Sequence, residues 1–187
     1  MGNSIVYSGN SSLASKMKEG LASIREQKAM LKMMDGIVLL MDVSGSMSEH
    51  VGGKRKIDSL REAVAEFNVV RKVSFSSGVF EGHIPEPQGN TQLTEALSYL
   101  GTLKPKEVIL ISDGLPDNPS TAITAAQSLN CPVNTLYIGV GGDDGERFMK
   151  TIAEVTGGKE LTINIKSNYK MEKSLSEGIK MMLPSGK

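Results

Sequence analysis

Residues 37–46 read IVLLMDVSGS, and they contain the change from an apolar run to a polar loop on which the fold depends. The first five residues are apolar without alternation, which is typical of a parallel strand covered on both faces. Similar runs occur at residues 107–111 and 133–140. Segments with helical spacing separate these runs, so the pattern predicts an α/β fold. We expect a doubly wound, mostly parallel sheet with helices on both faces.

The remaining elements follow from the spacing of apolar residues and from turn signals. Helices are predicted at residues 57–70, 93–100, 119–129, 145–156 and 168–182, and further strands at residues 71–75, 78–83 and 161–165. Asp143 or Asp144 is positioned to cap the fourth of these helices. We find no internal repeat and no long linker.

An amphipathic helix is predicted ahead of this pattern, at residues 12–33, because apolar residues recur there at steps of three, four and seven. Two interpretations stay open: the helix packs on its own domain, or it docks a partner helix or groove. We therefore divide the chain into an N-terminal extension, residues 1–34, and a domain, residues 35–187.

Composition narrows the classes of function. Lys plus Arg and Asp plus Glu number 21 each in 187 residues, and this balance gives no general attraction to nucleic acid or to an anionic membrane. Residues 54–56, the only tight basic cluster, are interpreted as a solvated loop. Cys131 is the single cysteine, so no intramolecular disulfide forms. The sequence shows no targeting signal and no apolar run long enough to span a bilayer, so we expect a cytoplasmic protein.

Polar side chains follow two of the buried strands. Asp42, Ser44 and Ser46 are two positions apart, so an extended chain points them the same way, and Gly45 gives the freedom to turn. Asp113 follows the second buried strand. Thr91 lies just before a predicted helix. Because ligands of such sheets bind at the carboxyl ends of strands, we expect these five oxygen-bearing side chains to converge.

This set contains no His or Cys, and hard oxygen ligands suit Mg²⁺, Mn²⁺ or Ca²⁺ rather than zinc. Two carboxylates and three neutral hydroxyls leave a divalent cation electron-poor. Such a cation gains from an additional carboxylate, so we expect a partner protein that presents Asp or Glu. Three residues are placed at the rim of this site or behind its ligands: Gly45, Met47 and Asp117.

The run from Asp42 to Ser46 resembles the Asp-x-Ser-x-Ser signature of von Willebrand factor type A (vWA) domains. Thr91 within Gly89-Asn90-Thr91 and Asp113 within Ser112-Asp113-Gly114 resemble the other two elements of that family's metal-ion-dependent adhesion site (MIDAS). The resemblance covers residues 35–182 and implies a six-stranded sheet. It implies that the two serines and the threonine contact the metal directly, that the aspartates do so directly or through water, and that a ligand carboxylate completes the shell.

The resemblance also bears on function and source. Stand-alone members in prokaryotes and their viruses often resemble partners of MoxR-type AAA+ ATPases, so such an ATPase is an expected partner by analogy. The leading hypothesis is a metal-dependent binding module that is not an enzyme.

Two alternatives remain. One is a Mg²⁺-dependent phosphohydrolase with Asp42 as the nucleophile, although Ser44 stands where such enzymes carry a second Asp. The other is a structural component of a viral or cellular assembly.

Overall fold

The computed structural model describes residues 10–166 and 170–184, and the chain divides into two units. One unit holds helix α1 (Asn10–Met34), which agrees with the helix predicted at residues 12–33. The amphipathic character of α1 and its role as an extension stay predictions. The other unit, Gly36–Pro184, carries all the remaining elements. Within the described ranges, no helix combines the length and the apolar composition that crossing a membrane requires.

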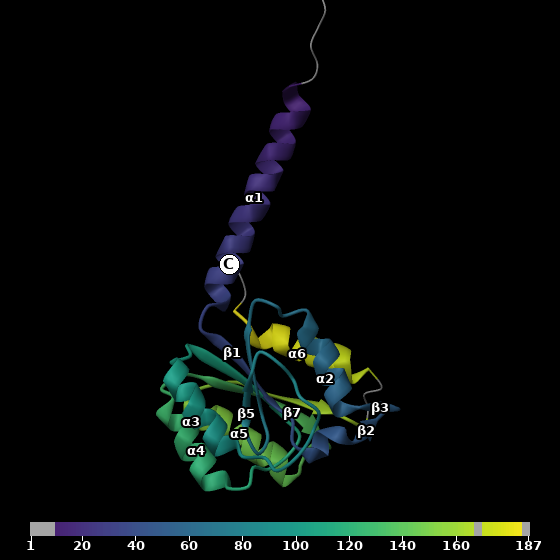
Figure 1. The fold of residues 1–187 in the computed structure, drawn as a ribbon, viewed down its shortest axis with the longest axis vertical. Helices are drawn as coiled ribbons and strands as arrows, with labels where there is room; N and C mark the ends of the chain where they lie inside the picture. The colour runs from purple at the N-terminus through teal and green to yellow at the C-terminus, as the bar shows by residue number, and fades with distance from the viewer. Residues whose placement is uncertain (1–9, 167–169, 185–187) are drawn as a thin grey trace, which may run out of the picture. The chain divides into compact units, whose positions relative to one another are not determined.

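The Gly36–Pro184 unit is built on a six-stranded sheet in the order β5-β4-β1-β6-β7-β8 (Figure 1). Its strands are β1 (Ile37–Asp42), β4 (Arg71–Phe75), β5 (Val79–Glu81), β6 (Glu107–Ser112), β7 (Val133–Gly139) and β8 (Glu160–Asn164). Every neighbouring pair is parallel except β4 and β5, which are antiparallel. The predicted mostly parallel, doubly wound sheet is therefore confirmed.

The chain winds outward from β1 in two directions. After β1 it builds β4 and β5 on one side, and it then returns to place β6, β7 and β8 on the other side. The strand order thus reverses between β1 and β6, and a crevice forms beyond the carboxyl ends of strands at such a reversal. Asp42 is the last residue of β1, and Asp113 directly follows β6. The topology alone places both carboxylates at this crevice.

Helices cover both faces of the sheet (Figure 1). On one face lie α3 (Leu93–Leu103), α4 (Pro119–Ser128) and α5 (Asp144–Thr156), and their apolar side chains share a core cluster with Val38, Leu40 and Leu110 of the sheet. The other face carries α2 (Lys56–Ala65) and α6 (Met171–Met182). Strand side chains alternate between faces, so Leu39 and Ile109 point toward this second layer, and both are fully buried.

Local chemistry fixes where several helices begin. The side chain of Asn118 accepts a hydrogen bond from the Thr121 backbone N–H at the start of α4, and Pro119 occupies the first turn, where its missing N–H costs nothing. Asp143 caps α5 by accepting from the Glu146 backbone N–H at 2.9 Å, as one of the two predicted caps. Of the last predicted helix, residues 168 and 169 lie outside the described residues.

The predicted helix at residues 57–70 is too long, because α2 ends at Ala65. Two turns follow it, in which the Phe67 N–H donates to Val64 and the Val70 N–H donates to Phe67. Phe67 and Val70 are both buried, so apolar residues continue at helical spacing in the sequence beyond the end of α2. This spacing is the reason for the longer prediction. The turns are needed because β4 must begin at Arg71, beside Val38 of β1.

Candidate metal site

The two aspartates of the predicted site lie at the ends of adjacent strands. Met41 of β1 is in register with Ile111 of β6, so Asp42 lies next to Ser112. The Ser112 hydroxyl donates a hydrogen bond of 2.6 Å to Oδ2 of Asp42. The other oxygen of Asp42 accepts from the backbone N–H of Ser44 at 2.8 Å. Asp42 is thereby held rigidly beneath the loop that follows β1.

This loop brings two hydroxyls toward the second aspartate. The chain turns after Ser44 into the short 3-10 helix η1 (Gly45–Ser48), and the hydroxyl oxygens of Ser44 and Ser46 lie 3.1 Å apart. The Ser46 hydroxyl donates to Oδ1 of Asp113 at 2.7 Å. The four side chains therefore form one group linked by hydrogen bonds, as the spacing in the sequence predicted.

Thr91 is held against this group by its backbone. The carbonyl of Gly89 accepts from the Gly45 N–H at 3.1 Å, and the carbonyl of Thr91 accepts from the Asp117 N–H, also at 3.1 Å. The loop that contains Thr91 is therefore tied on one side to the loop after β1 and on the other to the loop after β6. Thr91 itself is half-buried. The structure brings the three predicted loops together.

The electrostatics of Asp42 are unusual for an acidic residue. Its side chain is fully buried, and within residues 10–166 and 170–184 it has no ion pair: its recorded partners are a hydroxyl and a backbone N–H. Burial, opposed by the hydrogen bond from Ser112 and reinforced by the nearby charge of Asp113, raises the pKa of Asp42 to about 6. A buried carboxylate without a cation is costly.

The residues present fit a divalent cation. The cation would supply the positive charge that Asp42 lacks, and the hydroxyls of Ser44 and Ser46 add neutral oxygen donors. Among the residues described, no three His, Cys, Asp or Glu side chains gather into a metal-binding group. The site therefore differs from a carboxylate-rich calcium loop and from a zinc cluster of His and Cys.

The three rim residues have different surroundings. Gly45 is exposed, and its N–H joins two of the loops. Asp117 is exposed, and its backbone rather than its side chain is recorded as bonding the Thr91 loop. Met47, which was expected at the rim or behind the ligands, is fully buried in the core beneath η1 and so does not lie on the rim. A single turn of 3-10 helix points one of its three sides inward, and Met47 lies on that side.

The sequence did not reveal a basic residue that contacts the site. Residues 54–56 were interpreted as a solvated loop, but Lys56 is the first residue of α2 and only 4% exposed. Its ammonium nitrogen lies 2.7 Å from Oδ2 of Asp113 and 2.6 Å from Oε2 of Glu49. Burial lowers the pKa of Lys56, but the charge of Asp113 and the hydrogen bonds to Asp113 and Glu49 outweigh it, so the pKa lies above the ordinary value.

A small hairpin positions this lysine. Strands β2 (His50–Val51) and β3 (Lys54–Arg55) are antiparallel and are joined by Gly52 and Gly53, both of which have positive φ. Two such glycines are the usual signal for a tight two-residue hairpin turn, and this signal was available in the sequence. The hairpin closes where the Lys56 N–H donates to the Glu49 carbonyl at 2.9 Å.

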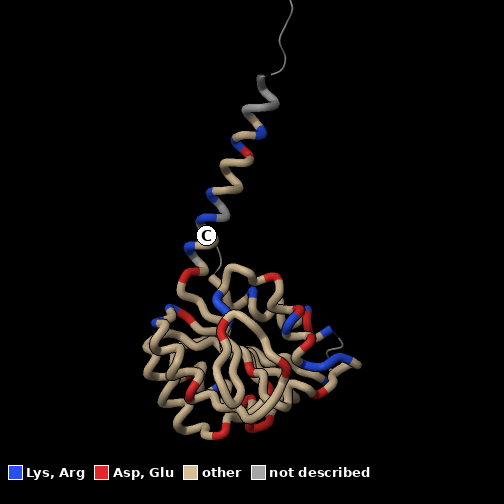
Figure 2. The backbone as a smooth tube through the Cα atoms, viewed as in Figure 1, with Lys and Arg blue, Asp and Glu red and all other residues tan. Residues whose placement is uncertain are grey.

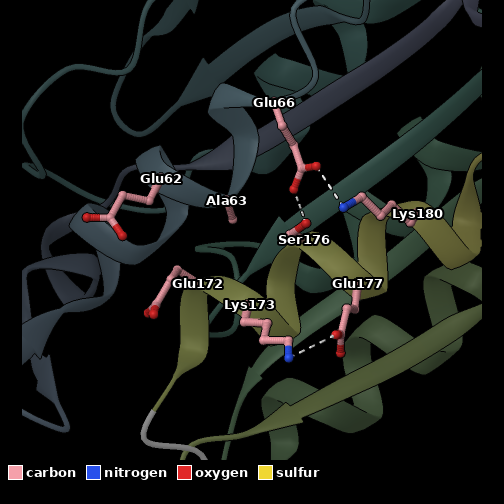
Figure 3. A pocket seen from close by; sticks show the side chains of 8 residues that line it. All are labelled: Glu62, Ala63, Glu66, Glu172, Lys173, Ser176, Glu177 and Lys180. Carbon is pink, nitrogen blue, oxygen red and sulfur yellow. Dashed lines mark hydrogen bonds and ion pairs between the residues drawn. The ribbon is translucent and has the colours of Figure 1, made fainter.

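Two hollows of about 390 Å³ each lie on the surface of the unit. One borders the site and is lined by Thr91, Glu95, Asp117, Asn118 and neighbouring residues. The other lies between α2 and α6 (Figure 3), where Glu66 accepts from Ser176 and pairs with Lys180 at 2.7 Å. Both hydrogen bonds lower the pKa of Glu66, that from Lys180 most. We interpret this second hollow as a charge-paired seam between two helices.

Comparisons with known proteins agree with the architecture. No family model matches the chain, and no curated protein matches it in sequence. Among solved structures, it is similar to a von Willebrand factor type A protein from Catenulispora acidiphila, with a TM-score of 0.59, 17% identity, and coverage of 76% of this chain and 42% of the other.

Two further structures have the same fold. Proximal thread matrix protein 1 from the mussel byssus, with a zinc-occupied MIDAS motif, gives a TM-score of 0.58 at 19% identity and covers 78% of this chain and 46% of its own. The vWF domain of the type V pili tip protein Mfa5 from Porphyromonas gingivalis gives 0.52 at 12% identity, covering 81% of this chain and 96% of its own. The match thus spans less than half of the first two proteins. The unit Gly36–Pro184 has the fold of a von Willebrand factor type A domain.

Proposed function

We propose that this protein is a binding module that captures an acidic residue of a partner protein through a divalent cation. The observation that carries the proposal is the state of Asp42: a fully buried carboxylate with no ion-pair partner among the described residues, linked through Ser44 and Ser46 to a second carboxylate, Asp113. A cation at this point would supply the positive charge that Asp42 lacks.

The proposed ligands have separate tasks. Asp42 and Asp113 provide the negative charge, while Ser44, Ser46 and Thr91 provide neutral oxygens. When bound, the ion attracts a carboxylate oxygen from outside, because three of its five protein donors carry no charge. The hollow beside Thr91 and Asp117 gives room for the partner residues that flank this acid.

The identity of the ion is open to experiment. Oxygen donors without His or Cys favour Mg²⁺ or Mn²⁺, with Ca²⁺ as a further candidate. The mussel byssus neighbour has zinc in its MIDAS motif, so Zn²⁺ belongs in the same titrations.

The first test is metal binding, measured by calorimetric titration of the whole chain with Mn²⁺. Thr91→Ala is expected to weaken binding at least tenfold, since a hydrogen bond or ligand to a charged centre contributes roughly 1.5–3 kcal/mol. Thr94→Ala is the matched control, because the Thr94 hydroxyl bonds Thr121 instead of facing the aspartates. Equal Mn²⁺ affinity in the unmodified protein, Thr91→Ala and Thr94→Ala contradicts the proposal, and so does the absence of Mn²⁺ binding in all three.

The second test is partner capture from the native host with Mg²⁺ and again with EDTA. Under the proposal, Asp42→Ala and EDTA each abolish recovery of a partner that Thr102→Ala still recovers, because the Thr102 hydroxyl bonds the Tyr99 carbonyl and does not line the hollow beside the site. A MoxR-type AAA+ ATPase is one partner that the resemblance in sequence suggests, and a cytoplasmic location would accord with it. Recovery of the same partner by Asp42→Ala in EDTA would show that no metal bridge is involved.

A phosphohydrolase is disfavoured by the geometry of Asp42. A nucleophilic carboxylate must reach the substrate with its own oxygen, whereas a carboxylate can serve a metal ion through a water molecule; both oxygens of Asp42 accept hydrogen bonds and its side chain is fully buried. A panel of phosphate esters tests this alternative directly.

A structural component of an assembly is the second candidate. Two of the fold neighbours come from a byssus thread and a pilus tip, but at 19% and 12% identity they establish only the fold. Gel filtration with and without EDTA tests whether metal drives self-association.

A further inference from the structure

Lys56 is the one basic side chain recorded in contact with the candidate metal ligands among the described residues. Its ammonium is 2.7 Å from Oδ2 of Asp113, and the exposed fractions of the two side chains are 5% and 1%. The other oxygen of Asp113 accepts from Ser46. Both oxygens of this carboxylate thus have partners within the protein, one of which carries a full positive charge.

The two aspartates consequently have different electrostatic surroundings. Asp42 has only neutral donors, whereas Asp113 is neutralised by Lys56. Counted together, the two carboxylates and the ammonium carry one negative charge. Glu49 also contacts Lys56, but its side chain is 65% exposed, so water screens its charge more strongly. Figure 2 shows basic and acidic positions interspersed along the backbone of the unit.

We propose that Lys56 is a specificity-determining residue of the metal site, where it acts as a built-in cation that opposes the bound ion. This inference rests on the proposed function. Lys56 weakens the affinity of the site for the ion alone, since it competes for Asp113 and repels a second cation. It also leaves the ion with a net positive charge that an external carboxylate can satisfy. The site is thereby selective for the ion and an acid together over the ion alone.

A purely structural role would give a different pattern. If the ion pairs served only to hold Asp113 in position, removing either Lys56 or Glu49 would weaken metal binding. If charge decides, the two removals act in opposite directions. Without Lys56 the site becomes more negative and binds the ion more tightly, and without Glu49 the ammonium is less compensated and the ion binds more weakly.

Calorimetric titration with Mn²⁺ alone distinguishes these cases in the full chain. We expect Lys56→Gln to bind Mn²⁺ about tenfold more tightly than the unmodified protein, and Glu49→Gln to bind it severalfold more weakly. Lys54→Gln is the matched control: it removes the same charge two residues earlier in the chain, where Lys54 pairs with Glu62 at 2.5 Å. Its affinity should match that of the unmodified protein.

The outcomes separate this inference from the proposed function. If the unmodified chain does not bind Mn²⁺, the proposed function fails. If it binds Mn²⁺ but Lys56→Gln binds equally or more weakly, the function stands and the role of Lys56 is overturned. Thermal melting in EDTA shows whether Lys56→Gln folds; if it does not, Lys56→Met, which keeps the length of the side chain without its charge, takes its place, and equal or weaker Mn²⁺ binding by that variant overturns the inference.

Discussion

Asp42 couples the stability of the protein to pH. Its pKa is raised from 3.8 to about 6 in the folded chain, mainly by burial. A raised pKa means that the folded state prefers the protonated form, so the stabilisation is complete below the unfolded pKa and is lost as the pH rises through about 6. A shift of this size corresponds to about 3 kcal/mol.

We therefore expect that in EDTA the free energy of unfolding, relative to that of Asp42→Asn, falls by up to about 3 kcal/mol between pH 4 and pH 7. Urea unfolding of both proteins across this range measures the difference, and other carboxylates cancel in the comparison. With saturating Mn²⁺ the trend should reverse, because the ion binds the ionised form. A difference that does not change with pH would show that Asp42 has an ordinary pKa.

Gly89 is a backbone position that no other residue can fill without strain. Its φ is +70°, and an added Cβ would collide with the side chain of Ser77. Its carbonyl also accepts from Gly45, so any shift moves two of the three loops of the site. Gly89→Ala should destabilise the protein by roughly 1–3 kcal/mol and weaken Mn²⁺ binding.

The control for this substitution is Gly142→Ala, which has a φ of +89° but open space around the added Cβ. It should cost about 1–2 kcal/mol from the left-handed backbone alone and leave Mn²⁺ binding unchanged. Chemical denaturation and calorimetry report the two quantities separately. Equal effects of the two substitutions on metal binding would mean that the Gly45–Gly89 contact does not support the site.

Replacing two helical glycines by Ala should change the stability of the protein in opposite directions, because the two positions differ in how closely the helix packs. Gly178 of α6 lies so close to the sheet that an added Cβ would approach Leu136 of β7 at 2.8 Å and Leu161 of β8 at 3.1 Å. Gly101 of α3 has room, since the nearest atom, in Leu129, would be 3.9 Å away.

Gly178→Ala should therefore destabilise the protein by about 1–3 kcal/mol through overpacking, in spite of the better helix propensity of Ala. Gly101→Ala should stabilise it by up to about 1 kcal/mol, because nothing opposes that propensity. Thermal melting of the two variants and of the unmodified protein measures both changes in stability. Stabilisation by Gly178→Ala would mean that α6 does not pack tightly on β7 and β8.

The elements that define the fold were predictable because their signals are local. The apolar run of β1 and that of β6 lie in the sheet interior with every side chain of residues 37–41 buried, as a strand covered on both faces requires. The convergence of Asp42, Ser44, Ser46 and Asp113 was expected because the carboxyl ends of parallel strands meet at one edge of a sheet, and the adjacency of β1 and β6 makes the two aspartates neighbours.

Other features were not predictable, because they depend on contacts between distant positions. The burial of Lys56 depends on its ion pair with Asp113, which is 57 residues away in the sequence. Lysine is rarely buried without a partner of opposite charge. The end of α2 at Ala65 depends on where β4 must pair with β1. Burial of Met47 follows from the direction in which η1 turns. None of these has a signature in neighbouring residues.

Metal binding should be visible in the melting of the whole Gly36–Pro184 unit, because the proposed ligands come from three loops that are far apart in sequence. A ligand at 100 times its dissociation constant stabilises by about 2.7 kcal/mol. For a unit of about 150 residues this corresponds to roughly 5–10 °C in Tm. Melting with Mn²⁺ and then with excess EDTA tests the shift, and Thr91→Ala, with binding at least tenfold weaker, should lower it by about half or more. The same Tm in both conditions would contradict metal binding at this site.

The backbone hydrogen bonds that tie the three loops together also affect how fast the ion binds. The bonds from Gly45 to Gly89 and from Asp117 to Thr91 use backbone atoms alone and none of the proposed ligand oxygens, so holding the loops together does not require the ion. Association is then limited by the departure of water from the ion, and Mg²⁺ releases its water reluctantly. In stopped-flow mixing, Ca²⁺ and Mn²⁺ should enter the site faster than Mg²⁺ even where Mg²⁺ is the more abundant ion at equilibrium.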